Sequence, residues 1–151
     1  MAEFTYNQLQ TVPYGQNFIF NTTIACNKGY VYHRDGSGLV TLRGIVNNPC
    51  CKFARYQVIF NGNIAIPEDG TPGAISATIA INGEPIQTSK AIVTPTAVNA
   101  YFNVTSTAII DVPAGCCAIV SVENTSDPPT SSSAGSSING INSNLEVKRL
   151  A

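Results

Sequence analysis

Charged residues are scarce in this chain of 151 residues, where Asp, Glu, Lys and Arg together make up only 11%. An average globular protein has about 25%. The formal net charge is −1, and the eight basic residues are scattered, with only Lys148 and Arg149 adjacent. Nucleic-acid binding depends on clustered Lys and Arg side chains that neutralise phosphates. The composition therefore predicts no nucleic-acid partner.

Histidine is nearly absent, since His33 is the single one in the chain. A β-barrel metalloenzyme needs several histidine ligands on facing strands, which one histidine cannot supply. His33 and Asp35 have the residue types of a base and its orienting carboxylate, but we expect a structural or solvated histidine. Ser37 lies in Gly-Ser-Gly without the full G-x-S-x-G motif of a nucleophile elbow, which indicates a turn. We predict no enzyme, no catalytic or metal-binding residue and no cofactor.

Long apolar runs are also absent. No segment approaches the roughly 20 consecutive apolar residues of a membrane-spanning helix, so we predict no membrane association. The start of the chain, from Met1 to Thr5, lacks the basic residues and apolar run of a secretory signal. If the chain is complete, we expect synthesis in a cytosol. A virion protein made in a host cytoplasm fits this, as does a spore-coat protein made in a mother cell.

What the sequence does have is alternation of apolar and polar residues. Between residues 54 and 66, one face carries Ala54, Tyr56, Val58, Phe60, Gly62, Ile64 and Ile66, and the other carries Arg55, Gln57, Asn61 and Asn63. Successive side chains of a β-strand point to opposite faces, so this period of two predicts a strand with one buried wall.

The same pattern recurs along the chain between Gly- and Pro-containing turns. We predict strands over 17–21, 29–34, 38–46, 53–66, 74–82, 86–93, 99–112, 115–123 and 138–150, with a further edge strand over 4–10. Asn82-Gly83 is a hairpin signal, and the Ser- and Pro-rich stretch 125–137 predicts a long solvated loop, with a functional tip as the alternative. Strands at this spacing predict an all-β sandwich or barrel.

Inward-facing residues follow from the alternation on four of these strands. The predicted inward sets are Ile75, Ala77, Ile79 and Ile81; Phe102, Val104, Ala108, Ile110 and Val112; Cys116, Ala118, Val120 and Val122; and Ile141, Leu145 and Val147.

The five cysteines have no zinc-binding spacing. Cys26 stands alone, and the others form the adjacent pairs Cys50-Cys51 and Cys116-Cys117. Neighbours on a strand point to opposite faces, which favours small buried side chains with one or two spare thiols. A disulfide from Cys26 to Cys50 or Cys51, and a metal site, are the alternatives. The sequence leaves the disulfide state open.

One stretch resembles a known family. Residues 99–125, NAYFNVTSTAIIDVPAGCCAIVSVENT, place an apolar strand before a D-V-P-A-G turn and a second apolar strand that runs into V-x-N. This is similar to consecutive strands of C1q/TNF-like jelly rolls, and the ending SNLEVKRLA resembles the last strand of bacterial members such as the trimeric tips of collagen-like spore-surface proteins. With 53–66, the resemblance covers most of 16–151. It implies a jelly-roll β-sandwich of about ten antiparallel strands that forms a homotrimer.

Apolar residues on the polar side of two predicted strands support an oligomer. Phe53 and Ile59 lie opposite the core face of 53–66, and Tyr101 and Ile109 lie opposite that of 99–112. Exposed apolar groups of a sheet need cover, and a subunit interface supplies it. Cover by a loop, or ordinary exposure of single residues, is the alternative.

Two further groups of residues complete the predictions. Residues 1–15 are expected to form an N-terminal arm or edge strand before a jelly-roll domain over 16–151. Phe4, Tyr6 and Pro13 are the candidate anchoring residues of this arm. Tyr30 and Tyr32 are a candidate ligand surface, because tyrosine offers sugars a flat apolar face and a hydroxyl group.

Two functions fit these features. The family's trimer implies display, and because this chain has no Gly-X-Y stalk it resembles phage head-decoration and fibre modules. We therefore expect a structural protein of the virion with other capsid proteins as partners. The second hypothesis is a carbohydrate-binding module at a bacterial cell or spore surface, with glycans bound by the tyrosines or the 125–137 loop.

Overall fold

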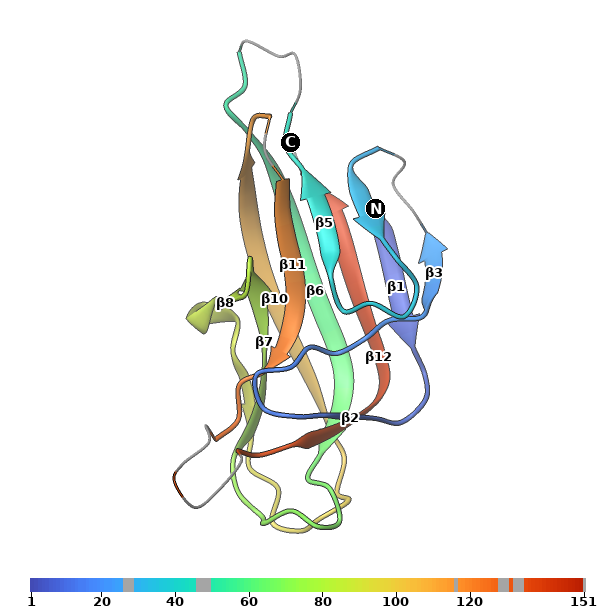
Figure 1. Cartoon of the computed structure of the whole chain (residues 1–151), viewed down its shortest axis with the longest axis vertical. Helices are drawn as coiled ribbons and strands as arrows, with labels where there is room; N and C mark the ends of the chain where they lie inside the picture. The colour runs from blue at the N-terminus through green and yellow to red at the C-terminus, as the bar shows by residue number, and fades with distance from the viewer. Residues whose placement is uncertain (26–28, 46–49, 116, 128–130, 132–134, 151) are drawn as a thin grey trace.

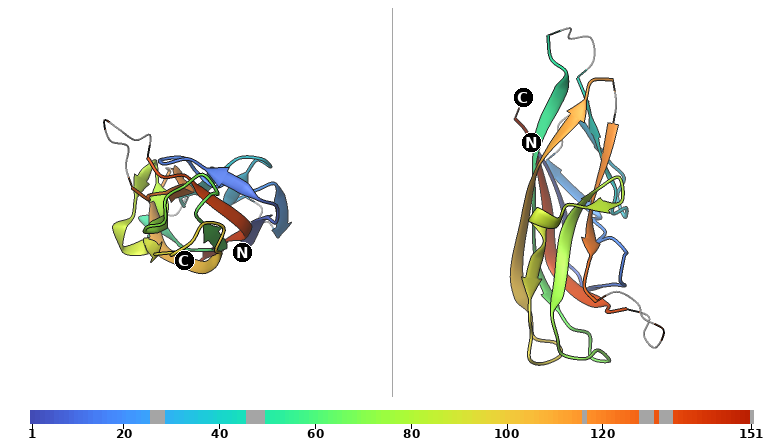
Figure 2. Two further views of the ribbon diagram at one scale, coloured as in Figure 1. Left: turned by 90° about the horizontal axis from the view of Figure 1, so that it is seen from below. Right: turned by 90° about the vertical axis from the view of Figure 1, so that its left-hand side faces the viewer.

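The computed structural model describes residues 1–25, 29–45, 50–115, 117–127, 131 and 135–150. Two antiparallel sheets face each other in an elongated sandwich (Figure 1). Figure 2 shows the two layers edge-on, with β11 in one and β6, β10 and β12 in the other. This confirms the predicted all-β jelly-roll sandwich.

The first sheet has the strand order β10-β6-β12-β1-β3, and β2 pairs with β12. Its strands are β1 (Ala2–Tyr6), β2 (Gln10–Val12), β3 (Thr22–Ala25), β6 (Phe53–Ala65), β10 (Phe102–Pro113) and β12 (Ile138–Arg149). The long strands β6, β10 and β12 form its centre and one edge.

The second sheet has the order β4-β5-β11-β7-β8, and β9 also pairs with β7. Its strands are β4 (Val31–His33), β5 (Val40–Arg43), β7 (Ile75–Ile81), β8 (Glu84–Pro85), β9 (Ala91–Val93) and β11 (Cys117–Asn124), and the short 3-10 helix η1 (Gln87–Ser89) separates β8 from β9. The hydroxyl of Ser89 accepts from the Ile79 amide at 3.1 Å. Ser89 thereby gives the edge of β7 a hydrogen-bond partner between the segment paired with β9 and the segment paired with β8.

The core lies between the inner faces of the two sheets, as the alternation predicts. The buried wall of β6 is formed by the predicted set, of which Tyr56, Phe60 and Ile64 are fully buried. The Tyr56 hydroxyl donates to the carbonyl of Arg43 on β5, which joins the two sheets. Burial of each large apolar side chain stabilises the fold by about 1.5–3 kcal/mol.

The strand predicted over 17–21 is wrong, because this segment passes from one sheet to the other. Phe18 donates its amide to the Val122 carbonyl of β11 (2.8 Å), whereas Asn21 donates to Thr5 of β1 (3.1 Å). Phe18 and Phe20 are fully buried between the sheets. The apolar alternation here marks a crossing, and β3 begins only at Thr22.

Two residues predicted to point into the core do not lie there. Ile141 pairs with Asn63, on the outer face, because the register of β12 shifts between Ile141 and Asn144 and Asn142 takes a φ of 51°. Such a bulge reverses which residues of a strand face inward. Phe102 is 46% exposed because it is the first residue of β10, an edge strand.

The N-terminal segment is not a separate arm. Strand β1 lies inside the first sheet, between β12 and β3, and Phe4 is 1% exposed. Tyr6 packs against the same core, while Pro13 is exposed in the following turn. The prediction of Phe4 and Tyr6 as anchoring residues of an arm is therefore corrected: their apolar side chains stabilise the sandwich.

Phe4→Ala should reduce the free energy of unfolding by about 3–5 kcal/mol, the usual cost of removing a buried phenylalanine ring. Phe53→Ala is the matched control, because that ring is 41% exposed and its loss should cost far less. Urea unfolding followed by circular dichroism measures both. Equal losses in the two variants would contradict the placement of β1 in the core.

Candidate functional site

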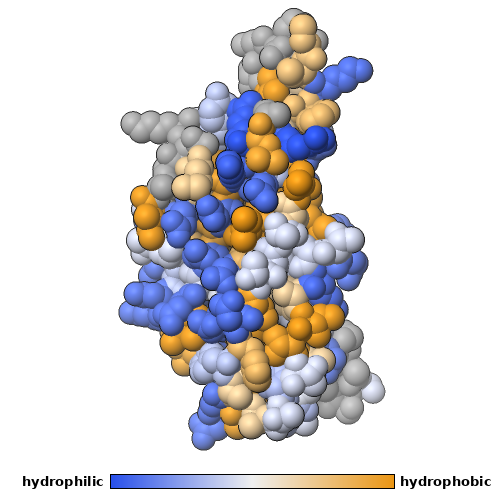
Figure 3. All heavy atoms as spheres, turned by 180° about the vertical axis from the view of Figure 1, so that it is seen from behind, coloured by the Kyte–Doolittle hydropathy of each residue, from blue (hydrophilic) through white to orange (hydrophobic). Residues whose placement is uncertain are grey.

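The outer face of the first sheet carries a strip without charged side chains. We define the uncharged strip by eight outward-facing residues of two paired strands: Asn103, Thr105, Thr107 and Ile109 on β10, and Gln57, Ile59, Asn61 and Asn63 on β6. Figure 3 shows this face, on which apolar side chains lie between polar ones. Depletion of charge is typical of the centre of a protein interface.

Hydrogen bonds across the two strands hold the polar part of the uncharged strip flat. Asn103 Nδ2 donates to Asn63 Oδ1 at 3.3 Å, and Thr105 Oγ1 donates to Asn61 Oδ1 at 3.2 Å. Cross-strand pairs of this kind restrict the rotamers of both side chains. A partner that covers the strip would therefore meet Asn61, Asn63, Asn103 and Thr105 already paired with one another.

The four candidate interface residues lie on or near this face but do not form one patch. Ile109 is 62% exposed, and Ile59 is its diagonal neighbour, because Ile109 pairs with Gln57 and Ile59 pairs with Thr107. Phe53 pairs with Pro113 at one end of the sheet. Tyr101, 41% exposed, precedes β10 at the other end. The structure brings only Ile59 and Ile109 together.

An ion pair bounds the uncharged strip on the side of Phe53. Arg55 donates from Nε to Asp111 Oδ1 (2.7 Å) and from its terminal nitrogen to Oδ2 (2.8 Å). The hydrogen bond to Arg55 lowers the pKa of Asp111, and the same contact raises the pKa of Arg55. The Arg55 guanidinium also lies 4.9 Å from the centre of the Phe53 ring. Along β6 and β10, charged side chains begin at this bidentate pair.

The two candidate ligand tyrosines lie at the edge of the second sheet and differ in availability. The Arg149 guanidinium stacks over Tyr30 at 3.9 Å from the ring centre, so one face of that ring is already in a cation–π contact. Tyr32 is 63% exposed on β4. Of these two tyrosines, Tyr32 is the one whose exposed ring is available to stack against a sugar.

His33 is buried between aromatic rings. Its ring centre lies 4.5 Å from that of Phe4, and Nε2 lies 2.9 Å from the Ser37 carbonyl oxygen. A carbonyl only accepts, so Nε2 carries the proton. The 3.9 Å between Nδ1 and Asp35 Oδ1 is too long for a hydrogen bond. Its burial gives His33 a packing role.

Three cysteines are described, and all are exposed: Cys50, Cys51 and Cys117. No disulfide joins any two of these three. Both members of the Cys50-Cys51 pair are exposed, so the expectation that one of them is buried is wrong. Cys26 and Cys116 lie outside the described residues, so the alternative of a disulfide from Cys26 to Cys50 or Cys51 stays untested. Among the described residues, no group of three or more His, Cys, Asp and Glu side chains could hold a metal ion.

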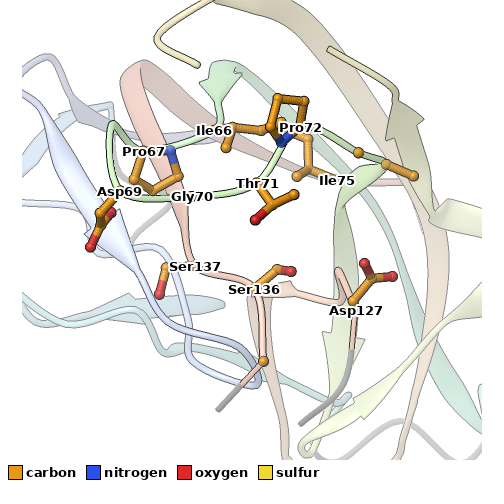
Figure 4. A pocket seen from close by; sticks show the side chains of 13 residues that line it. Ile66, Pro67, Asp69, Gly70, Thr71, Pro72, Ile75, Asp127, Ser136 and Ser137 are labelled. Atoms are coloured by element: carbon orange, nitrogen blue, oxygen red, sulfur yellow. The ribbon is translucent and has the colours of Figure 1, made fainter. Parts of the chain in front are cut away.

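A cavity that sequence reasoning missed lies between two loops at one end of the sandwich. We call it the end cavity; its volume is about 660 Å³, and it is lined by residues of the 66–75 segment and by Asp127, Gly135, Ser136 and Ser137 (Figure 4). The chain ends lie toward the other end of the sandwich, where Ala2 pairs with Val147. The turn Pro67-Glu68-Asp69-Gly70 and the 125–137 loop were visible in the sequence, but not their proximity.

A second, smaller hollow of about 340 Å³ shares Ala74, Ile75 and Asp127 with the end cavity. It is also lined by Tyr14 and Glu123. Burial raises the pKa of the Glu123 carboxyl, and the negative charge of Glu84 raises it further. The charged form of Glu123 is thus disfavoured by the folded state.

No helix in the described part of the chain is both long and apolar enough to cross a membrane.

Glu123→Gln should raise the melting temperature at pH 7, because a carboxyl whose pKa is raised on folding destabilises the native state when ionised. The gain should shrink as the pH falls and the native carboxyl takes up its proton. Asp111→Asn is the opposite control, since its lowered pKa predicts a stability loss at pH 7 that disappears in acid. Thermal melts across pH test both signs. A gain from Glu123→Gln that does not change with pH would contradict this origin.

The sequence matches no protein-family model and no curated protein. Its fold, however, is similar to solved structures. The globular domain of the zebrafish complement 1qA protein aligns with a TM-score of 0.60 and 12% identity over 96% of this chain and 94% of that one. The Eiger TNF of S. frugiperda aligns with a TM-score of 0.66 and 15% identity over 99% and 91%. The protein therefore has the C1q/TNF-like jelly-roll fold.

Proposed function

We propose that the protein is a non-enzymatic structural subunit that forms a homotrimer and is displayed on a phage particle, as head decoration or fibre. The observation that carries this proposal is the uncharged strip with Ile109 exposed on it. The strip offers a copy of the same chain a flat surface on which no ion pair has to be desolvated. The jelly-roll fold supports a binding or structural module.

The trimer is the arrangement that we propose for covering the uncharged strip. Leaving Ile109 and Ile59 in water forgoes the free energy of burying their apolar surface, about 25 cal/mol per Å². A cyclic assembly repeats the same contact in each subunit and closes on itself, which limits growth to a defined number of copies. The charged residues Glu3, Glu146 and Lys148 lie beside the strip on β1 and β12 and would form its polar rim.

The placement of the chain ends supports the display that we propose. Ala2 and Val147 lie side by side, toward one end of the sandwich, and the 66–75 segment that lines the end cavity lies at the other (Figure 1). We propose attachment through the first of these ends, so that the loops around the cavity project outward. Synthesis in a host cytoplasm and location in the virion belong to this proposal, as does contact with other capsid proteins.

A carbohydrate-binding module at a bacterial cell or spore surface is the second candidate. The open ring of Tyr32, 63% exposed, and the polar end cavity favour it. Glycan binding and display are compatible, because they would use different faces of the molecule.

Ile109→Lys should convert the trimer to monomers, because three ammonium groups would have to be buried in the assembly. Ile92→Lys is the matched control: Ile92 is 61% exposed against 62% for Ile109, but it lies on β9 of the other sheet. Light scattering coupled to size exclusion should give about three times the 15.9 kDa chain mass for the native protein and the control, and one chain mass for Ile109→Lys. A monomeric native protein at micromolar concentration would overturn the trimer.

Immunogold electron microscopy separates the two candidate locations. Antibody against the chain should decorate purified phage particles from the source culture at regular positions. Labelling confined to bacterial cells or spores would reject the virion and favour the surface module. Spores and phage-free cells from the same culture serve as the controls.

A further inference from the structure

The end cavity is large enough for an organic ligand and is built from two loops that are distant in sequence. Its volume of about 660 Å³ is within the range of about 300–1,000 Å³ typical of small-molecule sites. Figure 4 shows Asp69 and Asp127 on opposite sides of the opening, with Thr71, Ser136 and Ser137 between them.

These five polar side chains are not committed to the fold. In the described part of the chain, none of the side chains of Asp69, Thr71, Asp127, Ser136 and Ser137 takes part in a hydrogen bond or ion pair. The two carboxylates can accept several hydrogen bonds each, and the three hydroxyls can both donate and accept. The cavity is therefore lined by polar groups whose hydrogen-bonding capacity the described part of the chain does not use.

The backbone beneath these groups is held by a buried network. Asn124, fully buried, donates from Nδ2 to the carbonyls of Ser136 and Val12, each at 2.8 Å. Its Oδ1 accepts from the Ser126 amide at 3.0 Å, and the Ser126 hydroxyl accepts from the Ser76 amide at 3.0 Å. One amide side chain thus fixes both ends of the 125–137 loop to the sheets. A wall supported in this way loses little entropy when a ligand binds.

The opposite wall is held by its own turn. The Gly70 amide donates to the Pro67 carbonyl at 2.8 Å, and Asn99 donates to the Ile66 carbonyl at 2.9 Å. Ile66, Pro67, Pro72 and Ile75 contribute apolar surface to the same lining. The 66–75 wall thus combines apolar side chains with Asp69 and Thr71.

The lining selects one ligand chemistry. An anion such as phosphate would meet two carboxylates, and no Lys or Arg is among the described lining residues. In the described part of the chain, the two carboxylates are not joined by a third His, Cys, Asp or Glu side chain in a group that could hold a metal ion. A purely apolar ligand would strip water from five polar side chains, at a cost for each. A polyhydroxylated ring fits, because its hydroxyls pair with carboxylates and serines while its C–H faces pack on proline and isoleucine.

We propose that the end cavity is a binding site for a short neutral oligosaccharide. One sugar residue would lie between Asp69 and Asp127, and the next would extend over the shared residues Ala74 and Ile75 into the second hollow. There Tyr14 offers an aromatic ring, a common surface for amphipathic ligands. This inference deepens the second candidate function and rests on it, but it is independent of the phage particle and of the trimer, because every residue in it belongs to one chain.

The test is NMR titration of the ¹⁵N-labelled protein with maltotriose, cellotriose and tri-N-acetylchitotriose at millimolar concentrations. At least one trisaccharide should shift the amide signals of residues 69–71, 73–75, 127 and 135–137 and leave those of β4 unchanged. Asp127→Asn and Asp69→Asn should each weaken that binding about tenfold, because a charged acceptor is lost. Glu68→Gln removes the same charge from the same loop without touching the cavity and should bind like the native protein.

Several results would overturn the proposal. These are no shift with any of the trisaccharides, shifts centred on Tyr32, equal weakening by Glu68→Gln and Asp69→Asn, or shifts of the cavity signals by calcium chloride alone. Repeating the titration on Ile109→Lys separates this inference from the proposed function. A monomer that still binds the sugar supports the cavity, whatever the oligomeric state of the native chain.

Discussion

Contact between the inner faces of two antiparallel sheets is the constraint on which this molecule depends. Each long strand buries alternate side chains, and a sheet with one apolar face is stable only when another layer covers that face. Tyr56 joins the layers through its hydroxyl, and the crossing segment with Phe18 and Phe20 closes one side. Because this burial uses only the inward-facing half of the residues, the outward-facing half is left free to vary.

The outward-facing residues divide into surfaces of different chemistry. On the first sheet, the Arg55–Asp111 ion pair bounds the uncharged strip along β6 and β10, and charged side chains of β12 flank it. At the end of the sandwich, two loops enclose the end cavity, and its carboxylates and hydroxyls have no partner among the described residues. A flat surface of low charge suits contact with another protein, whereas a polar concavity suits a small ligand. One scaffold thus supplies two kinds of recognition surface at separate places.

The place of β1 shows how packing decides the role of a segment. The sequence predicted an N-terminal arm or edge strand over residues 1–15. In the structure β1 has a neighbour on each side, and Phe4 contacts the buried His33 ring. A strand with hydrogen bonds on both edges and a buried ring cannot act as a detachable anchor without unfolding part of the sheet. The role of residues 2–6 is therefore to complete the sheet.

The alternation in the sequence was enough to predict the all-β sandwich, the buried wall of β6 and the hairpin at Asn82-Gly83, because strand periodicity and turn conformation depend on residues that are near in sequence. It failed at Ile141, where one bulge reverses the face of a strand, and over 17–21, where a crossing segment has the same pattern as a strand. The site was less predictable. Ile59 and Ile109 could be placed on the outer face from their parity alone, but their contact depends on the register of two strands about 50 residues apart. The end cavity, with Asp69 and Asp127 on opposite walls, was decided only by tertiary structure, since long-range sheet pairing brings those loops together and no local sequence pattern encodes it.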